Sequence, residues 1–334
     1  MKPTHFAATL LLASVFATAS LAQDSQVHPG IALYEQGKYQ EAIYKLKFAV
    51  GEKDYKKDPL IWNYLGLAYL YQGDYKKAKK MLEKAVKLMP NNSTYRSNLA
   101  YAYFLNRQFG KSIAETNRAL ELDPKNVVAY HVRGKTKEQR GDLNDAEADA
   151  DLMIGIDPGY PYGYILKSDV LLDRLGKIVT TVDDIREHVE IIRQALDVLA
   201  IGVEKSRGGQ DLKQIESKYE AIGALYKHFT NEKTKVPLTG SPPEPGVTPL
   251  RILSKPRAGF TDMARSANFN GRIKVVALLG AGGRVEFVML LSRLGYGLDE
   301  NALDAARRIQ FEPKTVDGKA VSTVVIMEYS FVIY

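Results

Sequence analysis

Three prolines at one spacing constrain the fold of this chain more than any other feature. Pro90, Pro124 and Pro158 follow one another at intervals of 34 residues, and their surroundings repeat as KLMPNN, ELDPKN and GIDPGY. A fixed period of this length is typical of a solenoid, in which each unit buries its apolar face against its neighbours. The period therefore predicts a stack of similar units rather than one closed core.

Each unit has the pattern of two antiparallel helices joined by a turn. In WNYLGLAYLYQGDYKKAKKMLEKAVKLMP, Trp62, Leu65 and Tyr69 fall on one helical face, and a second apolar stripe follows the turn QGD. Gly66 and Ala78 are small residues at positions where the two helices would meet. The pattern predicts a closely packed helical hairpin.

These units resemble the tetratricopeptide repeat (TPR). The residues that carry the resemblance are Trp62, Leu65, Gly66, Tyr69, Gly73, Tyr75, Ala78 and Pro90, then Leu99, Tyr103, Phe109, Ala119 and Pro124, then Gly134, Gly141, Ala146 and Pro158. The last unit has Arg133 and Lys137 at core-type positions. With YEQGKYQEAIYKLKFAV upstream, the resemblance implies an all-α solenoid of about four helix-turn-helix repeats across residues 28–160.

In this repeat family, the first helix of each pair lines a concave face that holds a peptide or another protein. The stripe beside the buried one supplies the residues that we expect to bind a partner: Asn63, Leu67, Leu70, Tyr101, Phe104, His131 and Lys135. The alternative is that Tyr101 and Phe104 pack against neighbouring repeats and that His131 is a solvated histidine.

Residues 161–231 are expected to cap or extend the solenoid. YGYILKSDVLLDRLG is a candidate capping helix, and apolar spacing predicts further helices in 178–205 and 211–229. Residues 232–255 then form a linker, since six of the 14 prolines lie in the stretch 231–256. A proline-rich segment is extended and semi-rigid, so it is expected to space two domains.

The last eighty residues predict a small α+β unit of order β-β-α-β. RIKVVALL (272–279) and RVEFVMLL (284–291) alternate as strands around the turn GAGG, with Val285, Phe287 and Met289 expected on one face. LDENALDAARRI carries acidic residues at its start and arginines near its end, as a helix does. A last strand is expected from Val321 to Ile333.

The order and spacing of these pieces resemble the C-terminal domain of TonB-family energy transducers over about Pro256–Tyr334. The matching runs are PRAGFTDMAR, GLDENALDAARRIQFEP and DGK. In that family, the domain binds outer-membrane receptors by pairing a sheet edge with an extended peptide. We therefore expect partner binding along the last strand at Ser322, Val324, Ile326, Glu328 and Ser330, unless this edge is covered or pairs with a second copy to form a homodimer.

The first residues have the pattern of a signal peptide. Residues 1–22 comprise Lys2, an apolar stretch from Phe6 to Leu21, and the small-x-small ending Ser20-Leu21-Ala22. The apolar stretch is shorter than the roughly 20 residues of a membrane span. The pattern predicts export to the periplasm, and the alternative is an uncleaved anchor in the inner membrane.

The sequence offers no catalytic, metal or cofactor motif. Its five histidines lack metal-ligand spacing, it contains no cysteine, and GAGGRV lies between two strands rather than before a helix. Its net charge of +7 is dispersed, which argues against nucleic acid as a partner. The sequence thus predicts a non-enzymatic envelope adaptor that binds one protein through the repeats and another through the terminal domain. The alternatives are a membrane-anchored TonB-like transducer and an unrecognised envelope enzyme.

Overall fold

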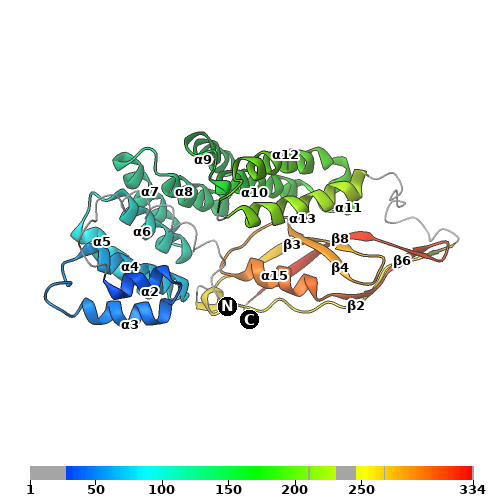
Figure 1. The fold of residues 1–334 in the computed structure, drawn as a ribbon. Coiled ribbons are helices and arrows are strands. Elements are labelled where there is room, and N and C mark those ends of the chain that lie inside the picture. The colour runs from blue at the N-terminus through cyan, green and yellow to red at the C-terminus, as the bar shows by residue number, and fades with distance from the viewer. Residues whose placement is uncertain (1–27, 210, 231–245, 267, 333–334) are drawn as a thin grey trace. The chain divides into compact units, whose positions relative to one another are not determined.

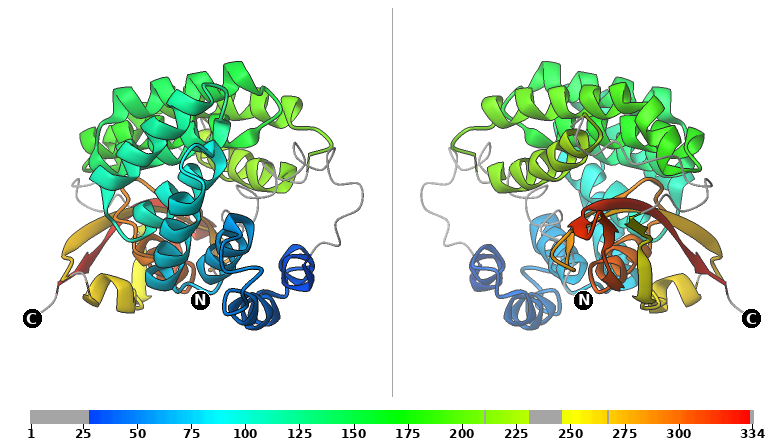
Figure 2. Two further views of the ribbon diagram at one scale, coloured as in Figure 1. Left: turned by 90° about the vertical axis from the view of Figure 1, so that its left-hand side faces the viewer. Right: turned by 90° about the vertical axis from the view of Figure 1, so that its right-hand side faces the viewer.

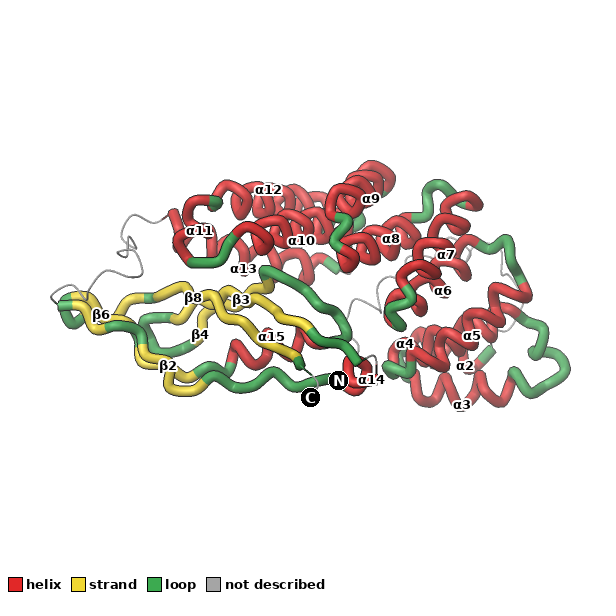
Figure 3. The backbone as a smooth tube through the Cα atoms, turned by 180° about the vertical axis from the view of Figure 1, so that it is seen from behind, coloured by secondary structure: helices red, strands yellow, loops and turns green. Residues whose placement is uncertain are grey.

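The structure is a computed structural model that describes residues 28–209, 211–230, 246–266 and 268–332 of the 334-residue chain (Figure 1). The predicted signal peptide and most of the predicted linker lie outside these residues. The chain divides into two compact units, residues 1–157 and 158–334. Figure 3 shows that every strand among the described residues belongs to the second unit.

The described part of the first unit consists of four successive helix pairs, as the 34-residue period predicts. The pairs are α2 (Pro29–Glu35) with α3 (Tyr39–Ala49), α4 (Pro59–Tyr71) with α5 (Tyr75–Leu88), α6 (Ser93–Leu105) with α7 (Phe109–Leu122), and α8 (Val127–Arg140) with α9 (Leu143–Ile156). Figure 2 shows the same succession from two other sides. The repeat solenoid is thereby confirmed.

The repeated proline motif ends one helix pair and begins the next. Asn92 and Asn126, which follow Pro90 and Pro124, are the N-caps of α6 and α8. Each asparagine side chain accepts a hydrogen bond from a backbone N–H of the first turn, at 2.9 Å in both cases. The cap satisfies a donor that the helix itself leaves unpaired. The motif therefore sets the start of each new repeat.

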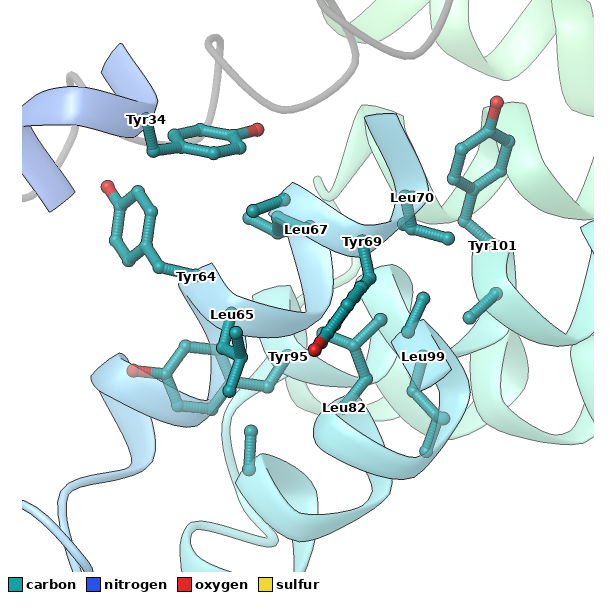
Figure 4. Packing of buried hydrophobic residues seen from close by; sticks show 14 of the residues in the cluster. Tyr34, Tyr64, Leu65, Leu67, Tyr69, Leu70, Leu82, Tyr95, Leu99 and Tyr101 are labelled. Atoms are coloured by element: carbon teal, nitrogen blue, oxygen red, sulfur yellow. The ribbon is translucent and has the colours of Figure 1, made fainter. Parts of the chain in front are cut away.

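Within a repeat, small residues bring the paired helices close together. A Cβ atom on Gly66 would lie 2.6 Å from Cγ of Leu82, which is closer than real side-chain contacts. Leu65 and Leu82 are both almost fully buried between α4 and α5 (Figure 4). The predicted close approach at Gly66 is present in the structure.

In the fourth repeat, the charged residues at core-type positions are paired with one buried carboxylate. Asp149 of α9 is 1% exposed, and it accepts hydrogen bonds from Arg133 of α8 at 2.6 and 3.0 Å. Lys137 Nζ lies 3.0 Å from Oδ2 of the same carboxylate. A buried carboxylate is tolerated when it is neutralised and hydrogen-bonded. An ion triad therefore joins α8 to α9.

In its described residues, the second unit begins with four helices and continues as strands. The helices are α10 (Pro161–Ile178), α11 (Val182–Glu187), α12 (Val189–Lys205) and α13 (Leu212–Thr230). The helix expected over 178–205 is interrupted at His188, between α11 and α12. The Asp184 carboxylate closes a capping box at the start of α11, and the hydrogen bonds that it accepts from Thr180 and Thr181 hold its pKa well below the usual range.

The strands of the described C-terminal residues form three small sheets. The main sheet has the order β4-β3-β8, all antiparallel, from β3 (Gly271–Leu279), β4 (Val285–Leu290) and β8 (Thr323–Phe331). Helices α14 (Asp262–Ser266) and α15 (Leu298–Arg307) belong to the same region. The predicted β-β-α-β order is that of β3, β4, α15 and β8.

Short strands that the sequence did not predict complete this region. β1 (Val247–Thr248) pairs with β6 (Lys314–Val316), which also pairs with β7 (Lys319–Val321), while β2 (Arg251–Ser254) pairs with β5 (Gln310–Glu312). Two of these strands lie in the stretch that we expected to be linker. Their partners are about sixty residues away in sequence, and strands of two to four residues leave no clear alternation to recognise.

One expectation about the second strand is wrong. The pairing register shifts between Leu278 and Leu279, so that Leu278 faces Phe287 and Leu279 faces Val285. This β-bulge at Glu286 turns Val285 to the opposite face from Phe287 and Met289. The sequence alone predicted one continuous alternation and placed all three side chains on the same face.

Candidate protein-interaction sites

Strand β8 lies at the edge of the main sheet. Among the described residues it pairs with β3 alone, from Gly271 opposite Phe331 to Leu279 opposite Thr323. An edge strand leaves alternate backbone N–H and C=O groups without a ladder partner. The register shows which residues these are.

The direction of the backbone groups follows from Lys274, the partner of Glu328. The N–H of Lys274 donates to Ser292 Oγ at 2.8 Å, and its carbonyl accepts from the N–H of Leu291 at 2.9 Å. Both groups of Lys274 thus point away from β8, so Lys274 and Glu328 form a non-hydrogen-bonded pair. The N–H and C=O of Glu328 therefore point outward from the sheet. By the alternation of the ladder, so do those of Val324, Ile326 and Ser330.

The residues predicted along this edge differ in where their side chains lie. Val324 is buried, Ile326 is half-buried, and Glu328 and Ser330 are exposed. Ser322 lies outside the strand, and its hydroxyl accepts a hydrogen bond from the N–H of Ala281 at 3.1 Å. Four of the five residues are thus brought together in one outward-facing row of backbone groups.

Lys255 lies against this edge, and sequence reasoning did not single it out. Its Nζ donates to the outward carbonyl of Glu328 at 2.9 Å and lies 4.9 Å from the ring centre of Tyr329. Burial raises the pKa of Tyr329 above its usual value. Lysine is a common way of protecting an edge strand from unwanted pairing. Nothing in the sequence next to Lys255 reveals a contact with a residue so far along the chain.

Both faces of the main sheet are covered by helices of the same unit. On one face, Ile273, Val275 and Tyr329 are buried in a cluster with Leu298 and Ala302 of α15. The opposite face carries the buried side chains of Val276, Leu278, Phe287, Met289 and Val324.

Helices α13 and α11 contact strands β4 and β8, and the C-terminal end of α10 lies against the chain just after β4. Lys274 Nζ donates to the carbonyl of Val179 at 3.0 Å, and Arg293 Nη2 lies 2.6 Å from Oδ1 of Asp169. A Cβ atom on Gly176 would lie 2.6 Å from the carbonyl carbon of Leu291 and would overlap its oxygen. Because both faces are occupied, a partner that adds a strand must do so at an edge, and β8 is the longer of the two edge strands, β4 and β8.

The residues predicted to line the repeat groove are largely buried. Leu67, Leu70 and Tyr101 are 5% exposed or less and belong to the same apolar cluster, which Figure 4 shows together with Tyr34 and Tyr64. Phe104 packs against this cluster and stacks with Tyr101 at a centroid distance of 6.1 Å.

The polar members of that set are also engaged. Asn98 Nδ2 donates to Oδ1 of Asn63 at 3.0 Å, which links α6 to α4 inside the stack. His131 is buried, and Lys135 forms an ion pair with Glu138, whose side chain is also buried. The role of all seven residues in partner binding stays a prediction.

Neither a metal cluster nor a membrane span is present in the part of the chain that the structure describes. No three His, Cys, Asp or Glu side chains there are grouped to hold an ion. No helix among those residues is both long and apolar enough to cross a bilayer.

A stack of helix pairs and a sheet with an open edge define a class of proteins that bind other proteins. Comparison with known families identifies the two kinds of domain. Models of the tetratricopeptide repeat match residues 59–92 and 94–126, and the model of the Gram-negative bacterial TonB protein C-terminal domain matches residues 256–333. The chain is a tetratricopeptide-repeat protein with a TonB-family C-terminal domain.

Individual relatives are distant and match part of their length. Human serine/threonine-protein phosphatase 5 is 23% identical over 170 residues, which are 49% of this chain and 33% of the phosphatase. Cell division cycle protein 27 homolog A of Arabidopsis thaliana is 33% identical over 104 residues, 31% of this chain and 14% of that protein. The chain thus spans about a third of the length of the phosphatase.

Solved structures are similar at a low level. A thermophilic TPR protein of Thermus thermophilus is 19% identical with a TM-score of 0.47, covering 59% of this chain and 96% of its own. The first TPR of Spaghetti, bound to an HSP90 peptide, is 24% identical with a TM-score of 0.33, covering 34% and 89%. These scores are too low to support an argument about function.

Proposed function

We propose that this protein is a periplasmic adaptor of the cell envelope that joins two other proteins. The repeats hold one protein or peptide, and the C-terminal domain adds an extended segment of another to strand β8. Tetratricopeptide repeats and TonB C-terminal domains bind other proteins and are typically non-catalytic. The two families therefore support a general role as a protein-interaction adaptor. The periplasmic location and binding by strand addition are what we propose.

The observation that carries the proposal is the outward row of backbone groups on β8. Strand addition obtains its affinity from main-chain hydrogen bonds, so it requires an edge whose N–H and C=O groups point outward. Val324, Ile326, Glu328 and Ser330 meet that requirement. Lys255 holds one of the carbonyls, so an incoming strand displaces its ammonium group from Glu328.

The alternative is an anchored transducer that draws energy from the inner membrane. This reading requires residues 1–22 to remain in the bilayer, whereas the adaptor requires their removal. Intact mass of the native protein from fractionated cells separates the two. A chain that begins at Ser20 or Gln23 in the soluble fraction supports the adaptor, and a chain that begins at Met1 in the membrane fraction supports the transducer.

Strand addition is tested by a proline at Ile326. The N–H of Ile326 points outward, so Ile326→Pro removes a donor that an added strand needs and leaves the β3–β8 ladder in place. Ile326→Val keeps the donor and is the matched control. A photo-crosslinking amino acid at Ser330, which is exposed, reports the partner in living cells.

We expect a crosslinked product with the parent chain and with Ile326→Val, and its loss with Ile326→Pro. Circular dichroism of the purified variants establishes that the fold is kept. If folded Ile326→Pro gives the same crosslinked product as Ile326→Val, the partner does not bind by strand addition and this part of the proposal fails.

A further inference from the structure

Helix α3 of the first repeat turns two aromatic side chains toward solvent. Tyr44 is 72% exposed and Phe48 is 70% exposed, and they are four residues apart, so they lie on one side of the helix. The opposite side of α3 is buried against the rest of the repeat. An amphipathic helix ordinarily places polar residues on its outer side. Here the centre of that side is aromatic.

Lysines flank this aromatic pair in the sequence. Lys45 and Lys47 are its neighbours on α3, and the loop that follows carries Lys53, Lys56 and Lys57. From residue 38 to residue 57 the chain has six lysines and three acidic residues, and all six lysines are exposed. None of them forms an ion pair with a residue that the structure describes. Their charges are available to an outside partner.

Charge is also distributed unevenly along the first unit. Helix α5 of the second repeat has six lysines and one glutamate, whereas α9 of the fourth has four acidic residues and no basic one. The first two repeats therefore create a positive potential that the fourth opposes. Such a gradient orients the unit before contact, with its first repeats toward a negatively charged surface.

From this surface we propose that the first repeat docks on an anionic lipid bilayer through Tyr44, Phe48 and the adjoining lysines. Aromatic side chains prefer the headgroup region, and lysines beside them are attracted by anionic lipid. The residues from 38 to 87 contain lysine but no arginine. Protein interfaces are enriched in arginine and depleted in lysine, so the composition favours a lipid surface over an acidic protein.

The chain contains its own reporter for this contact. Trp62, the single tryptophan, is in α4, and its Nε1 donates to the carbonyl of Lys56 at 2.9 Å. The indole is thus fixed to the lysine loop. Docking of the loop on a bilayer should shift the tryptophan emission to shorter wavelength.

The experiment measures sedimentation of the full chain with vesicles and follows Trp62 emission. One set of vesicles contains phosphatidylglycerol and phosphatidylcholine, and the other contains phosphatidylcholine alone. Residues 1–22 are the same in every variant, so the comparison between variants removes their contribution. Tyr44→Ser with Phe48→Ser removes the aromatic pair, and Ile201→Ser with Tyr219→Ser removes exposed apolar side chains of α12 and α13 as a matched control.

We expect binding to anionic vesicles that weakens on raising salt from about 0.05 M to about 0.5 M. The α3 double variant should bind at least about tenfold more weakly, and each Lys→Gln change at Lys45 or Lys47 should lower binding about fivefold. The control pair should bind as the parent does. Equal loss in both double variants, or equal binding to neutral and anionic vesicles, would overturn the proposal. Absence of binding to both kinds of vesicle would also overturn the proposal. An acidic protein would then be the partner of this face.

Discussion

Gly176 provides a test of how α10 is held against the main sheet. In an ordinary helix, replacing glycine by alanine stabilises the fold by up to about 1 kcal/mol, because alanine loses less conformational entropy. At Gly176, however, the new methyl group would overlap the backbone carbonyl of Leu291. A backbone carbonyl cannot rotate away as a side chain can. We therefore place the overpacking cost near the upper end of its usual range, about 3 kcal/mol.

The balance of these two terms predicts that Gly176→Ala destabilises the second unit by about 2 kcal/mol. For a unit of this size, that loss lowers the melting temperature by about 4–8 °C. Gly155 of α9 is the matched control, because it also lies near the end of a helix and a Cβ there would meet nothing within 4 Å. Gly155→Ala should leave stability unchanged or raise it slightly.

The assay combines urea unfolding followed by circular dichroism with tryptophan fluorescence. Circular dichroism reports on the helices of both units, whereas Trp62 reports on the first unit alone. Gly176→Ala should shift the transition seen by circular dichroism and leave the fluorescence transition in place. If Gly176→Ala is as stable as the parent chain, α10 does not pack on Leu291 as described.

Two further predictions concern the first unit. Asp149→Ala leaves two cations without their buried partner and should cost about 3–5 kcal/mol in urea unfolding. Arg193→Ala in α12 of the second unit breaks only exposed ion pairs and should cost much less, so similar losses would refute the ion triad. His28 caps α2 by accepting from the N–H of Gly30, and burial lowers its pKa below the usual 6.5. Because the unfolded chain then binds the proton more tightly, this contribution is present above pH 6.5 and is lost as pH falls through 6.5 toward the pKa of the folded state. Protection of the Gly30 amide against hydrogen exchange, corrected for its intrinsic rate, should fall over the same range, and constant protection would contradict the cap.

Local patterns predicted the elements of the fold well. The prolines at 90, 124 and 158 marked the repeat boundaries, because the N-cap of the next helix follows each of them two residues later. Gly66 revealed a close helix contact since few other residues permit one. The order of strands and helix after residue 270 followed from alternation and helix-end charges.

Contacts between distant residues could not be predicted in the same way. Arg133 and Lys137 looked misplaced until the fold brought Asp149 to them, and nothing in the sequence assigns a partner to a buried charge. The contact of Asp169 with Arg293 joins residues 124 positions apart. The burial of Leu67 and Tyr101 depends on how neighbouring repeats stack. Lys255 contacts β8 only because the fold brings these two distant segments of the chain together.

The grouping of α10–α13 with the C-terminal sheet changes what the proline-rich segment does. α13 ends at Thr230 and β1 begins at Val247, and both belong to the second unit. The segment between them therefore connects two elements of one unit. Its length then enters the stability of that unit through the entropy of joining the two elements, which costs only about 0.6 kcal/mol more when the length of a connection doubles. Insertions there should change the stability of the second unit slightly and leave the spacing between folded bodies as it is.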